Sequence, residues 1–241
     1  MPHHPGHVSG TVSEGHATPA PPRPRKSISS LREPVQRVIG PVTRWLIRRG
    51  VHPNAITVLG FVVTVVGAVM FSQDHVHIGG ILILLGGLLD VFDGSVARES
   101  GLASKFGAFF DATLDRISEI AMYIGLMTLY NAYELEFIDI WMIYIIALAL
   151  GGSLMVSYTR AKAESLGLDC SVGLMERGER ILVLGLGAAI FGLAWDGMVL
   201  SSIIVIVALL TNATAIQRMF WVYRRGTGVP LDDGGDAAGK A

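Results

Sequence analysis

Residues 78–97 read IGGILILLGGLLDVFDGSVA, and this stretch indicates the fold class of the chain. Its length matches the roughly 20 residues that an α-helix needs to cross the hydrocarbon core of a bilayer. The stretch carries no charged side chain before Asp90 and Asp93, so both carboxylates lie toward one end of an otherwise apolar helix. The pattern therefore predicts a transmembrane helix with an acidic end.

Five further apolar stretches accompany it, at approximately residues 56–72, 108–130, 138–159, 180–195 and 199–222. Hydrophobic residues make up 51% of the 241 residues and charged residues only 16%, whereas a soluble domain carries about 25% charged residues. This composition argues against a soluble enzyme and against a disordered regulator. We expect an all-α, polytopic membrane protein with six transmembrane helices.

Basic residues are distributed unevenly among the connecting segments. The segments near 73–77, 131–137 and 196–198 contain no Lys or Arg, so all 19 basic residues lie on the other side of the predicted spans. By the positive-inside rule, we predict a multi-pass protein of the cell membrane with both termini and the acidic helix ends in the cytoplasm. The net charge of −1 gives no signal for a nucleic-acid partner.

Two tails flank the predicted membrane domain of residues 27–225. Residues 1–26 and 226–241 contain few large apolar side chains, so we expect both tails to be disordered. At the start of the domain, residues 27–50 place apolar side chains at three- and four-residue spacing with arginines between them. This pattern predicts a basic amphipathic helix in an anionic membrane surface, with an ordinary packed helix as the alternative.

Four aspartates form the pattern that points to chemistry. Asp90 and Asp93 are three residues apart in one predicted helix, so they share a helical face. Asp111 and Asp115 are four residues apart in the next helix, which a short connection makes an antiparallel neighbour. Charges inside a membrane are costly, and carboxylates without Cys or His suit Mg²⁺, Mn²⁺ or Ca²⁺. Two metal ions in such a cluster suit phosphoryl transfer, whereas the alternative is a set of helix-end charges that reach interfacial water.

Small and cationic residues border these acids. Gly94 leaves room for another group to approach the backbone. Arg98 lies one turn beyond Asp93 and can face a phosphate oxygen, and Lys105 follows the connection. A metal cluster bordered by cationic side chains suits a diphosphate substrate.

Residues 90–115 read DVFDGSVARESGLASKFGAFFDATLD and match D-x₂-D-G-x₂-A-R-x₈-G-x₃-D-x₃-D at every specified position. The segment closely resembles the signature of the CDP-alcohol phosphotransferase family (class I CDP-alcohol phosphatidyltransferases), and the resemblance covers about residues 30–225. Such enzymes displace CMP from a CDP-linked lipid with an alcohol acceptor. The resemblance implies two Mg²⁺ ions, for which Mn²⁺ can substitute, and a homodimer.

The resemblance also assigns roles to individual residues by motif position. Asp90, Asp93 and Asp111 would be metal ligands, and Asp115 would be a ligand that also serves as general base. Five residues would contact CDP-diacylglycerol: Gly94, Arg98 and Ser104, together with Asn54 and Thr57 of a P-N-x-x-T element at residues 53–57. Taken alone, Asn54 and Thr57 are also typical of a helix N-cap.

A second basic cluster bears on the acceptor. Residues 157–164 read SYTRAKAE and residues 174–180 read LMERGER. Together with the connection between the acidic helices, they supply candidate ligands for an acceptor phosphate: Lys105, Arg160, Arg177 and Arg180. These two segments resemble the corresponding segments of bacterial phosphatidylinositol phosphate synthases. The resemblance implies an inositol phosphate acceptor, and glycerol 3-phosphate is the near alternative. Salt bridges with Glu164, Glu176 and Glu179 are the competing interpretation.

A transporter with an intramembrane divalent-cation site is the alternative from another class of protein. The acids cluster near one membrane face, and no polar residues continue a path through the outer halves of the predicted helices. This pattern favours the enzyme. CMP release from CDP-diacylglycerol by the purified protein discriminates between the two.

Overall fold

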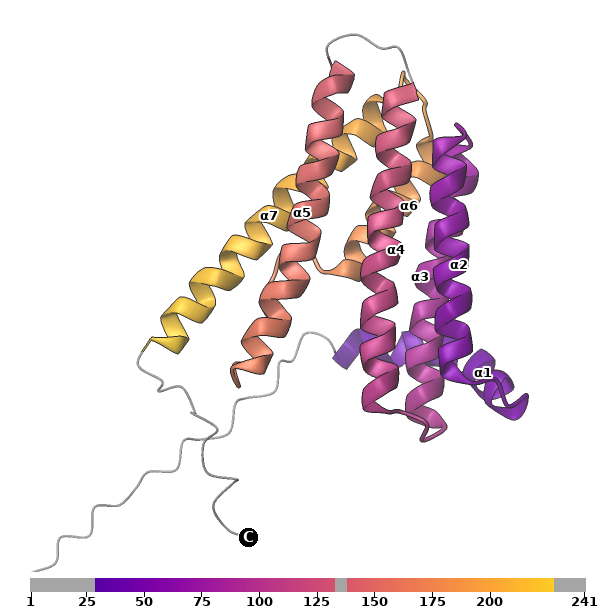
Figure 1. Cartoon of the computed structure of the whole chain (residues 1–241). Coiled ribbons are helices and arrows are strands. Elements are labelled where there is room, and N and C mark those ends of the chain that lie inside the picture. Colours follow the sequence, from indigo (N-terminus) through magenta and orange to yellow (C-terminus); the bar gives the residue numbers. More distant parts are fainter. Residues whose placement is uncertain (1–28, 133–137, 228–241) are drawn as a thin grey trace, which may run out of the picture. The chain divides into compact units, whose positions relative to one another are not determined.

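The computed structural model describes residues 29–132 and 138–227, which form seven helices and no strand (Figure 1). The chain divides into two compact units, residues 1–40 and 41–241, and everything after α1 belongs to the second. The predicted disordered tail of residues 1–26 lies outside the described residues, as does nearly all of the predicted tail 226–241.

The first helix, α1 (Ser29–Arg48), falls within the predicted range 27–50. It ends where the chain enters the left-handed region at Gly50, with a φ of 68°. The amide of Val51 donates to the carbonyl of Leu46 at 3.2 Å across this turn. Such a closure satisfies a carbonyl at the helix end and favours glycine, which has no Cβ to clash.

Six helices follow: α2 (Pro53–Ser72), α3 (Val76–Glu99), α4 (Lys105–Ala132), α5 (Ile138–Ser165), α6 (Arg177–Phe191) and α7 (Met198–Gly226). Each predicted span largely coincides with one of them. Four segments of the described chain are long and apolar enough to cross a membrane, namely α2, α3, α7 and Trp141–Ser165 of α5. This finding supports the predicted membrane protein. The helix α4 carries several charges, and α6 has only 15 residues. Neither helix meets this criterion of length and hydropathy, so it supports four of the six predicted spans.

The helices α2, α3 and α4 lie side by side, and α5 lies beside α7 (Figure 1). Glycines permit the close packing of α2 on α3. A Cβ added at Gly67 would lie 3.1 Å from the carbonyl oxygen of Gly79, and one at Gly60 would lie 3.3 Å from that of Gly86. Small residues at a helix interface are typical of membrane proteins, because lipid provides no hydrophobic drive for helix association.

The apolar core includes buried side chains of α4, α5, α6 and α7. Two hydroxyl pairs join α4 to its neighbours: Tyr123 to Ser153 of α5 at 3.0 Å, and Tyr130 to Ser201 of α7 at 2.8 Å. Hydrogen bonds of this kind specify which helices meet in an apolar medium. The helix α4 is therefore held on several sides, which fixes the acidic residues near its start.

Candidate active site

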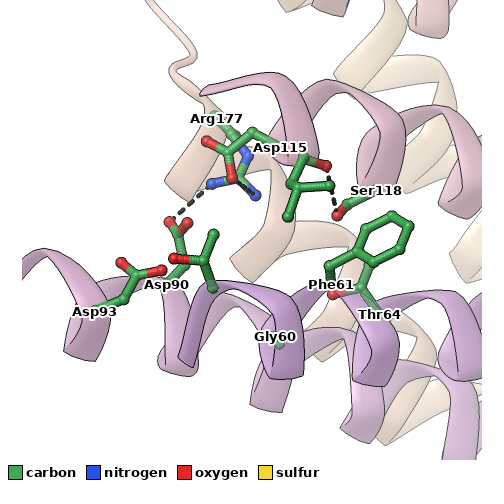
Figure 2. Close-up of a pocket in the computed structure, with 11 residues that line it drawn as sticks. Gly60, Phe61, Thr64, Asp90, Asp93, Asp115, Ser118 and Arg177 are labelled. Carbon is green, nitrogen blue, oxygen red and sulfur yellow. Dashed lines mark hydrogen bonds and ion pairs between the residues drawn. The ribbon is translucent and has the colours of Figure 1, made fainter. Parts of the chain in front are cut away.

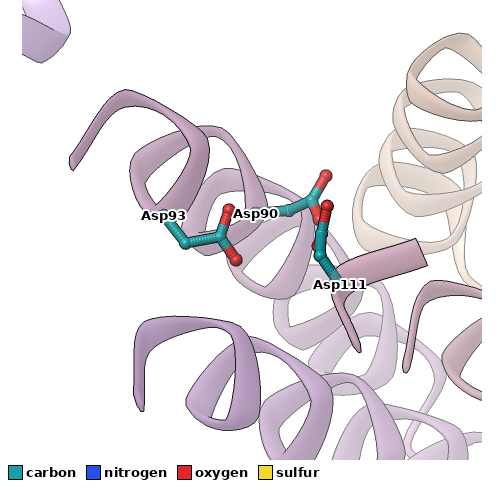
Figure 3. A group of neighbouring side chains, drawn as sticks. All are labelled: Asp90, Asp93 and Asp111. Carbon is teal, nitrogen blue, oxygen red and sulfur yellow. The ribbon is translucent and has the colours of Figure 1, made fainter. Parts of the chain in front are cut away.

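Three aspartates converge where the C-terminal part of α3 meets the N-terminal part of α4 (Figure 3). One carboxylate oxygen from each of Asp90, Asp93 and Asp111 lies within 4.8 Å of the others. Asp93 is buried, and the other two are half-buried. The predicted convergence of the two acidic helix faces is thus present in the structure.

Two oxygens of this cluster lack hydrogen bonds. Asp93 Oδ2 and Asp111 Oδ1 are buried without a hydrogen-bond partner among the described residues. A buried carboxylate oxygen without a partner costs free energy that a cation would recover. Carboxylates alone are the ligands that hard divalent cations prefer. The donor set therefore fits Mg²⁺ or Mn²⁺.

The fourth aspartate joins the site through an arginine (Figure 2). Arg177 Nη1 lies 2.7 Å from Asp90 Oδ2, and Arg177 Nη2 lies 2.7 Å from Asp115 Oδ1. Its guanidinium therefore bridges α3 and α4. Arg116 Nη1 is more distant from Asp115, at 3.9 Å. Asp115 is 15% exposed and Arg177 20% exposed, so this bridge is shielded from water on most sides.

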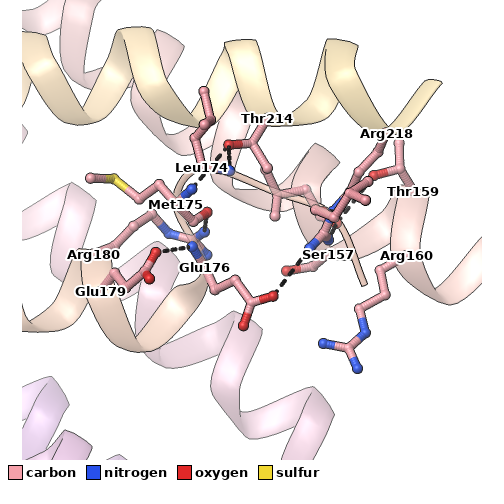
Figure 4. A network of polar contacts seen from close by, with 12 residues as sticks. Ser157, Thr159, Arg160, Leu174, Met175, Glu176, Glu179, Arg180, Thr214 and Arg218 are labelled. Carbon is pink, nitrogen blue, oxygen red and sulfur yellow. Dashed lines mark hydrogen bonds and ion pairs between the residues drawn. The ribbon is translucent and has the colours of Figure 1, made fainter. Parts of the chain in front are cut away.

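The local sequence explains why Arg177 lies at this point. Glu176 is the N-cap of α6 and forms a capping box with Glu179, whose carboxylate accepts from the Glu176 amide at 2.8 Å. Arg177 is therefore the first residue of the helix. The preceding loop is held by α7, because Thr214 Oγ1 accepts from the amides of Leu174 and Met175 at 3.1 Å (Figure 4).

One turn further along α6, Arg180 is fully buried. Its Nε donates to Glu119 Oε1 at 2.9 Å, and its Nη2 lies 2.7 Å from the same oxygen. This pair anchors the start of α6 against α4. Arg218 of α7 completes the support, since its Nε donates to the carbonyl of Val172 at 2.7 Å in the loop before α6 (Figure 4).

An open pocket of about 210 Å³ adjoins the acidic cluster. Asp93 and Asp111 line it, and so do all five residues that the motif associates with the nucleotide lipid: Asn54, Thr57, Gly94, Arg98 and Ser104. The structure thus brings these residues together from α2, α3, α4 and the connection before α4.

Neither Asn54 nor Thr57 caps the start of α2 beside this pocket. His52 is the N-cap of α2, because its Nδ1 accepts from the Asn54 amide at 3.2 Å. Thr57 Oγ1 donates to the carbonyl of Pro53 at 3.2 Å. The interpretation of Asn54 and Thr57 as N-caps is therefore wrong. Ser104, by contrast, acts as a cap, since its Oγ accepts from the Gly107 amide at 3.0 Å.

The four basic residues predicted to bind an acceptor phosphate lie in different environments. Lys105 is exposed at the start of α4. Arg160 is exposed and pairs with Glu164 at 2.8 Å. Arg177 lies in the site, whereas Arg180 is buried against Glu119. The salt bridge expected by the competing interpretation is therefore present at Arg160. Among the described residues, Arg177 and Arg180 pair with other acids than the glutamates of the α6 capping box, and Glu176 instead lies 3.7 Å from Arg218.

Sequence reasoning missed Glu119 and Arg218. Glu119 follows Asp115 by four residues and so shares its helical face, a signal that was present in the sequence. Arg218 had no such signal, because its partners are two backbone carbonyls and the Glu176 carboxylate, all in segments distant along the chain.

Comparison with known proteins gives concordant results. Residues 50–214 match the sequence profile of the CDP-alcohol phosphatidyltransferase family. The chain is 33% identical to the archaetidylinositol phosphate synthase of Pyrococcus horikoshii, over 82% of this chain and 97% of that protein. It is 37% identical to the phosphatidylinositol phosphate synthase of Streptomyces avermitilis, over 78% of this chain and 79% of that protein.

Solved structures of the phosphatidylinositol phosphate synthase of Mycobacterium tuberculosis are also similar. One contains bound CDP-DAG and superposes with a TM-score of 0.68 at 32% identity, covering 78% of this chain and 94% of that chain. Another is a complex with manganese and citrate, with a TM-score of 0.69 at 32% identity, covering 77% of this chain and 88% of that chain.

Proposed function

Because the chain belongs to the CDP-alcohol phosphatidyltransferase family, we propose that it transfers the phosphatidyl group of CDP-diacylglycerol to a hydroxyl of an inositol phosphate. CMP is the second product. The observation that carries this proposal is the meeting of a three-carboxylate cluster with a pocket lined by the residues of the family motif. The relatives named as inositol phosphate lipid synthases support the choice of acceptor.

The pocket of about 210 Å³ holds the cytidine diphosphate part of the donor lipid in this proposal. Arg98 faces the diphosphate, because its guanidinium lies at the pocket wall, 3.2 Å from where a Cβ on Gly94 would stand. A larger residue at Gly94 would therefore displace Arg98. Asn54, Thr57 and Ser104 supply polar atoms to the same wall.

The four aspartates Asp90, Asp93, Asp111 and Asp115 hold two Mg²⁺ ions in this proposal, and Mn²⁺ can replace them. When bound, such ions neutralise charge on the diphosphate and on the departing CMP. Asp115 takes the proton of the acceptor hydroxyl. The acceptor oxygen forms a bond to the phosphorus that bears the diacylglycerol, and the bond from that phosphorus to CMP breaks.

The acceptor phosphate contacts the accessible members of the basic set. Lys105 and Arg160 are exposed, and Arg177 borders the acids directly. Arg180 is fully buried and anchors α6 through Glu119, so in this proposal it positions Arg177 and does not contact the phosphate itself. Guanidinium groups suit this task because their fork matches two phosphate oxygens.

The proposal extends to the placement of the chain in the cell membrane. All six helices α2 to α7 span the bilayer, with both termini and the acidic cluster on the cytoplasmic side, and α1 lies in the membrane surface as a basic amphipathic helix. The protein functions as a homodimer. Accessibility of terminal epitopes in sealed vesicles tests the orientation, and cross-linking in membranes tests the dimer.

The function is tested by CMP release from purified protein supplied with CDP-diacylglycerol and a set of acceptors. We expect release that depends on inositol phosphate and stops in excess EDTA. Faster turnover with glycerol 3-phosphate would identify a phosphatidylglycerophosphate synthase instead. Absence of CMP release with every acceptor, with CDP-archaeol included as a second donor, would favour the cation transporter.

A further inference from the structure

We propose that Arg177 is an internal counter-ion that takes the place of a divalent cation between Asp90 and Asp115, and that it leaves these carboxylates when the site fills with metal. This inference rests on the metal-dependent function proposed above. It assigns Arg177 a positioning role that neither the motif nor the names of the relatives contain.

The first argument is the geometry of the bridge. Two nitrogens of one guanidinium contact carboxylates on two different helices, each at 2.7 Å. The guanidinium thus supplies positive charge to both Asp90 and Asp115, which a second divalent cation would also need as ligands. The guanidinium and a second metal ion therefore compete for these two carboxylates.

The second argument is that the four aspartates differ in their hydrogen-bond and ion-pair partners. Asp93 and Asp111 each keep a buried oxygen with no hydrogen-bond partner in the described ranges, while Asp90 and Asp115 share the single positive charge of Arg177. A first cation can use oxygens of Asp90, Asp93 and Asp111 while Arg177 stays on Asp115. A second cation that needs Asp115 must displace Arg177. The two binding events consequently differ in affinity.

The third argument is that the Arg177 side chain can rotate while the start of α6 stays in place. Its Nε is buried without a hydrogen-bond partner in the described chain, so its hydrogen bonds and ion pairs there are those to the two carboxylates. The start of α6 is meanwhile fixed by the capping box and by the buried pair of Arg180 with Glu119. Rotation of the Arg177 side chain alone breaks the bridge, and the released guanidinium is then free for an acceptor phosphate.

The test titrates the purified full-length protein with Mn²⁺ alone and counts bound ions by the electron paramagnetic resonance signal of free Mn²⁺. The wild type should bind two ions with unequal affinity. In Arg177→Gln, the Mn²⁺ concentration that fills the weaker site should fall by roughly tenfold or more, because a charge-assisted contact no longer competes. Arg177→Lys, which keeps the charge but cannot span both acids, should lie between the two.

Arg116→Gln is the matched control, since it removes the same charge 3.9 Å from Asp115 without breaking the bridge. It should shift the weaker site much less than Arg177→Gln does. Equal shifts in both variants, or weaker Mn²⁺ binding in Arg177→Gln, would overturn the inference while leaving the metal site intact. A wild type that binds no Mn²⁺ would instead remove the metal site itself, and the inference with it.

Thermal unfolding supplies a second readout that does not depend on activity. Without metal, Arg177→Gln leaves Asp90 and Asp115 uncompensated, so its Tm in EDTA should fall below that of the wild type. The rise in Tm on adding Mn²⁺ should be larger in the variant. A rise equal to that of the wild type would contradict the exchange of arginine for metal.

Discussion

The start of α6 makes two ion pairs with α4, and these two pairs lie in contrasting surroundings. Arg177 meets Asp115 in a site where Asp115 is 15% exposed, whereas Arg180 meets Glu119 with side-chain exposures of 0% and 3%. The arginines are three residues apart on one helix, and their partners are four apart on another. The comparison shows that the same pair of helices carries one partly accessible ion pair and one that is almost fully buried.

The largest expected effect is on turnover, after a change in the partly exposed pair of Arg177 and Asp115. Asp115→Asn removes the proposed general base and should lower kcat by roughly 10²–10⁴-fold. Binding of CDP-diacylglycerol should persist, because the pocket residues are unchanged. A radiolabelled substrate assay and a lipid-binding assay on the same preparation separate these outcomes, and a near-normal rate would refute the assignment of the base.

The buried pair should respond in stability instead. Arg180→Met leaves Glu119 buried without its partner, a change that costs about 3–5 kcal/mol. The Tm should therefore fall markedly. The double variant Arg180→Met/Glu119→Leu should recover most of that loss, because neither charge remains buried. Failure of the double variant to recover would mean that the pair does more than compensate charge.

Substitution of the exposed basic residues should have a smaller effect, on the KM for the acceptor. Lys105→Ala and Arg160→Ala should each raise the KM for inositol phosphate by roughly tenfold, the size expected when one charge-assisted contact is lost. The KM for CDP-diacylglycerol should change little. Arg98→Ala is the control from the nucleotide pocket and should give the opposite pattern. Equal changes for both substrates in all variants would assign these residues a structural role.

The smallest effect is expected from the N-terminal tail. A protein that begins near Ser27 should keep its specific activity in detergent, since residues 1–26 contain few large apolar side chains and precede the motif residues. Rates measured at saturating concentrations of both substrates provide the check. A large loss would show that the tail contributes to the site.

Much of this arrangement could be predicted from periodicity. The helix ranges followed from apolar stretches, and the three- and four-residue spacings of the aspartates placed Asp90, Asp93 and Asp111 together. The pocket residues also came together as the motif implied. These features depend on local spacing and on one short connection between neighbouring helices, which the sequence displays directly.

The partners of the arginines could not be predicted in this way. Arg180 and Glu119 are 61 residues apart, and their pairing depends on how α6 packs in the finished bundle. The alternative interpretation of Asn54 and Thr57 as N-caps of α2 was also wrong. Pro53 at the first helical position was the available signal, because proline favours that position and so moves the cap back to His52.

The charges of α4 have a consequence for the biogenesis of the membrane domain. In the proposed six-span topology, α4 would enter the bilayer with carboxylates whose insertion alone costs several kcal/mol. Their arginine partners are synthesised about 60 residues later, as the 61-residue separation of Glu119 from Arg180 requires. The acids of α4 would therefore lack these partners until α6 has been synthesised. Assembly of the acidic site would then depend on α6 joining α3 and α4 late in synthesis.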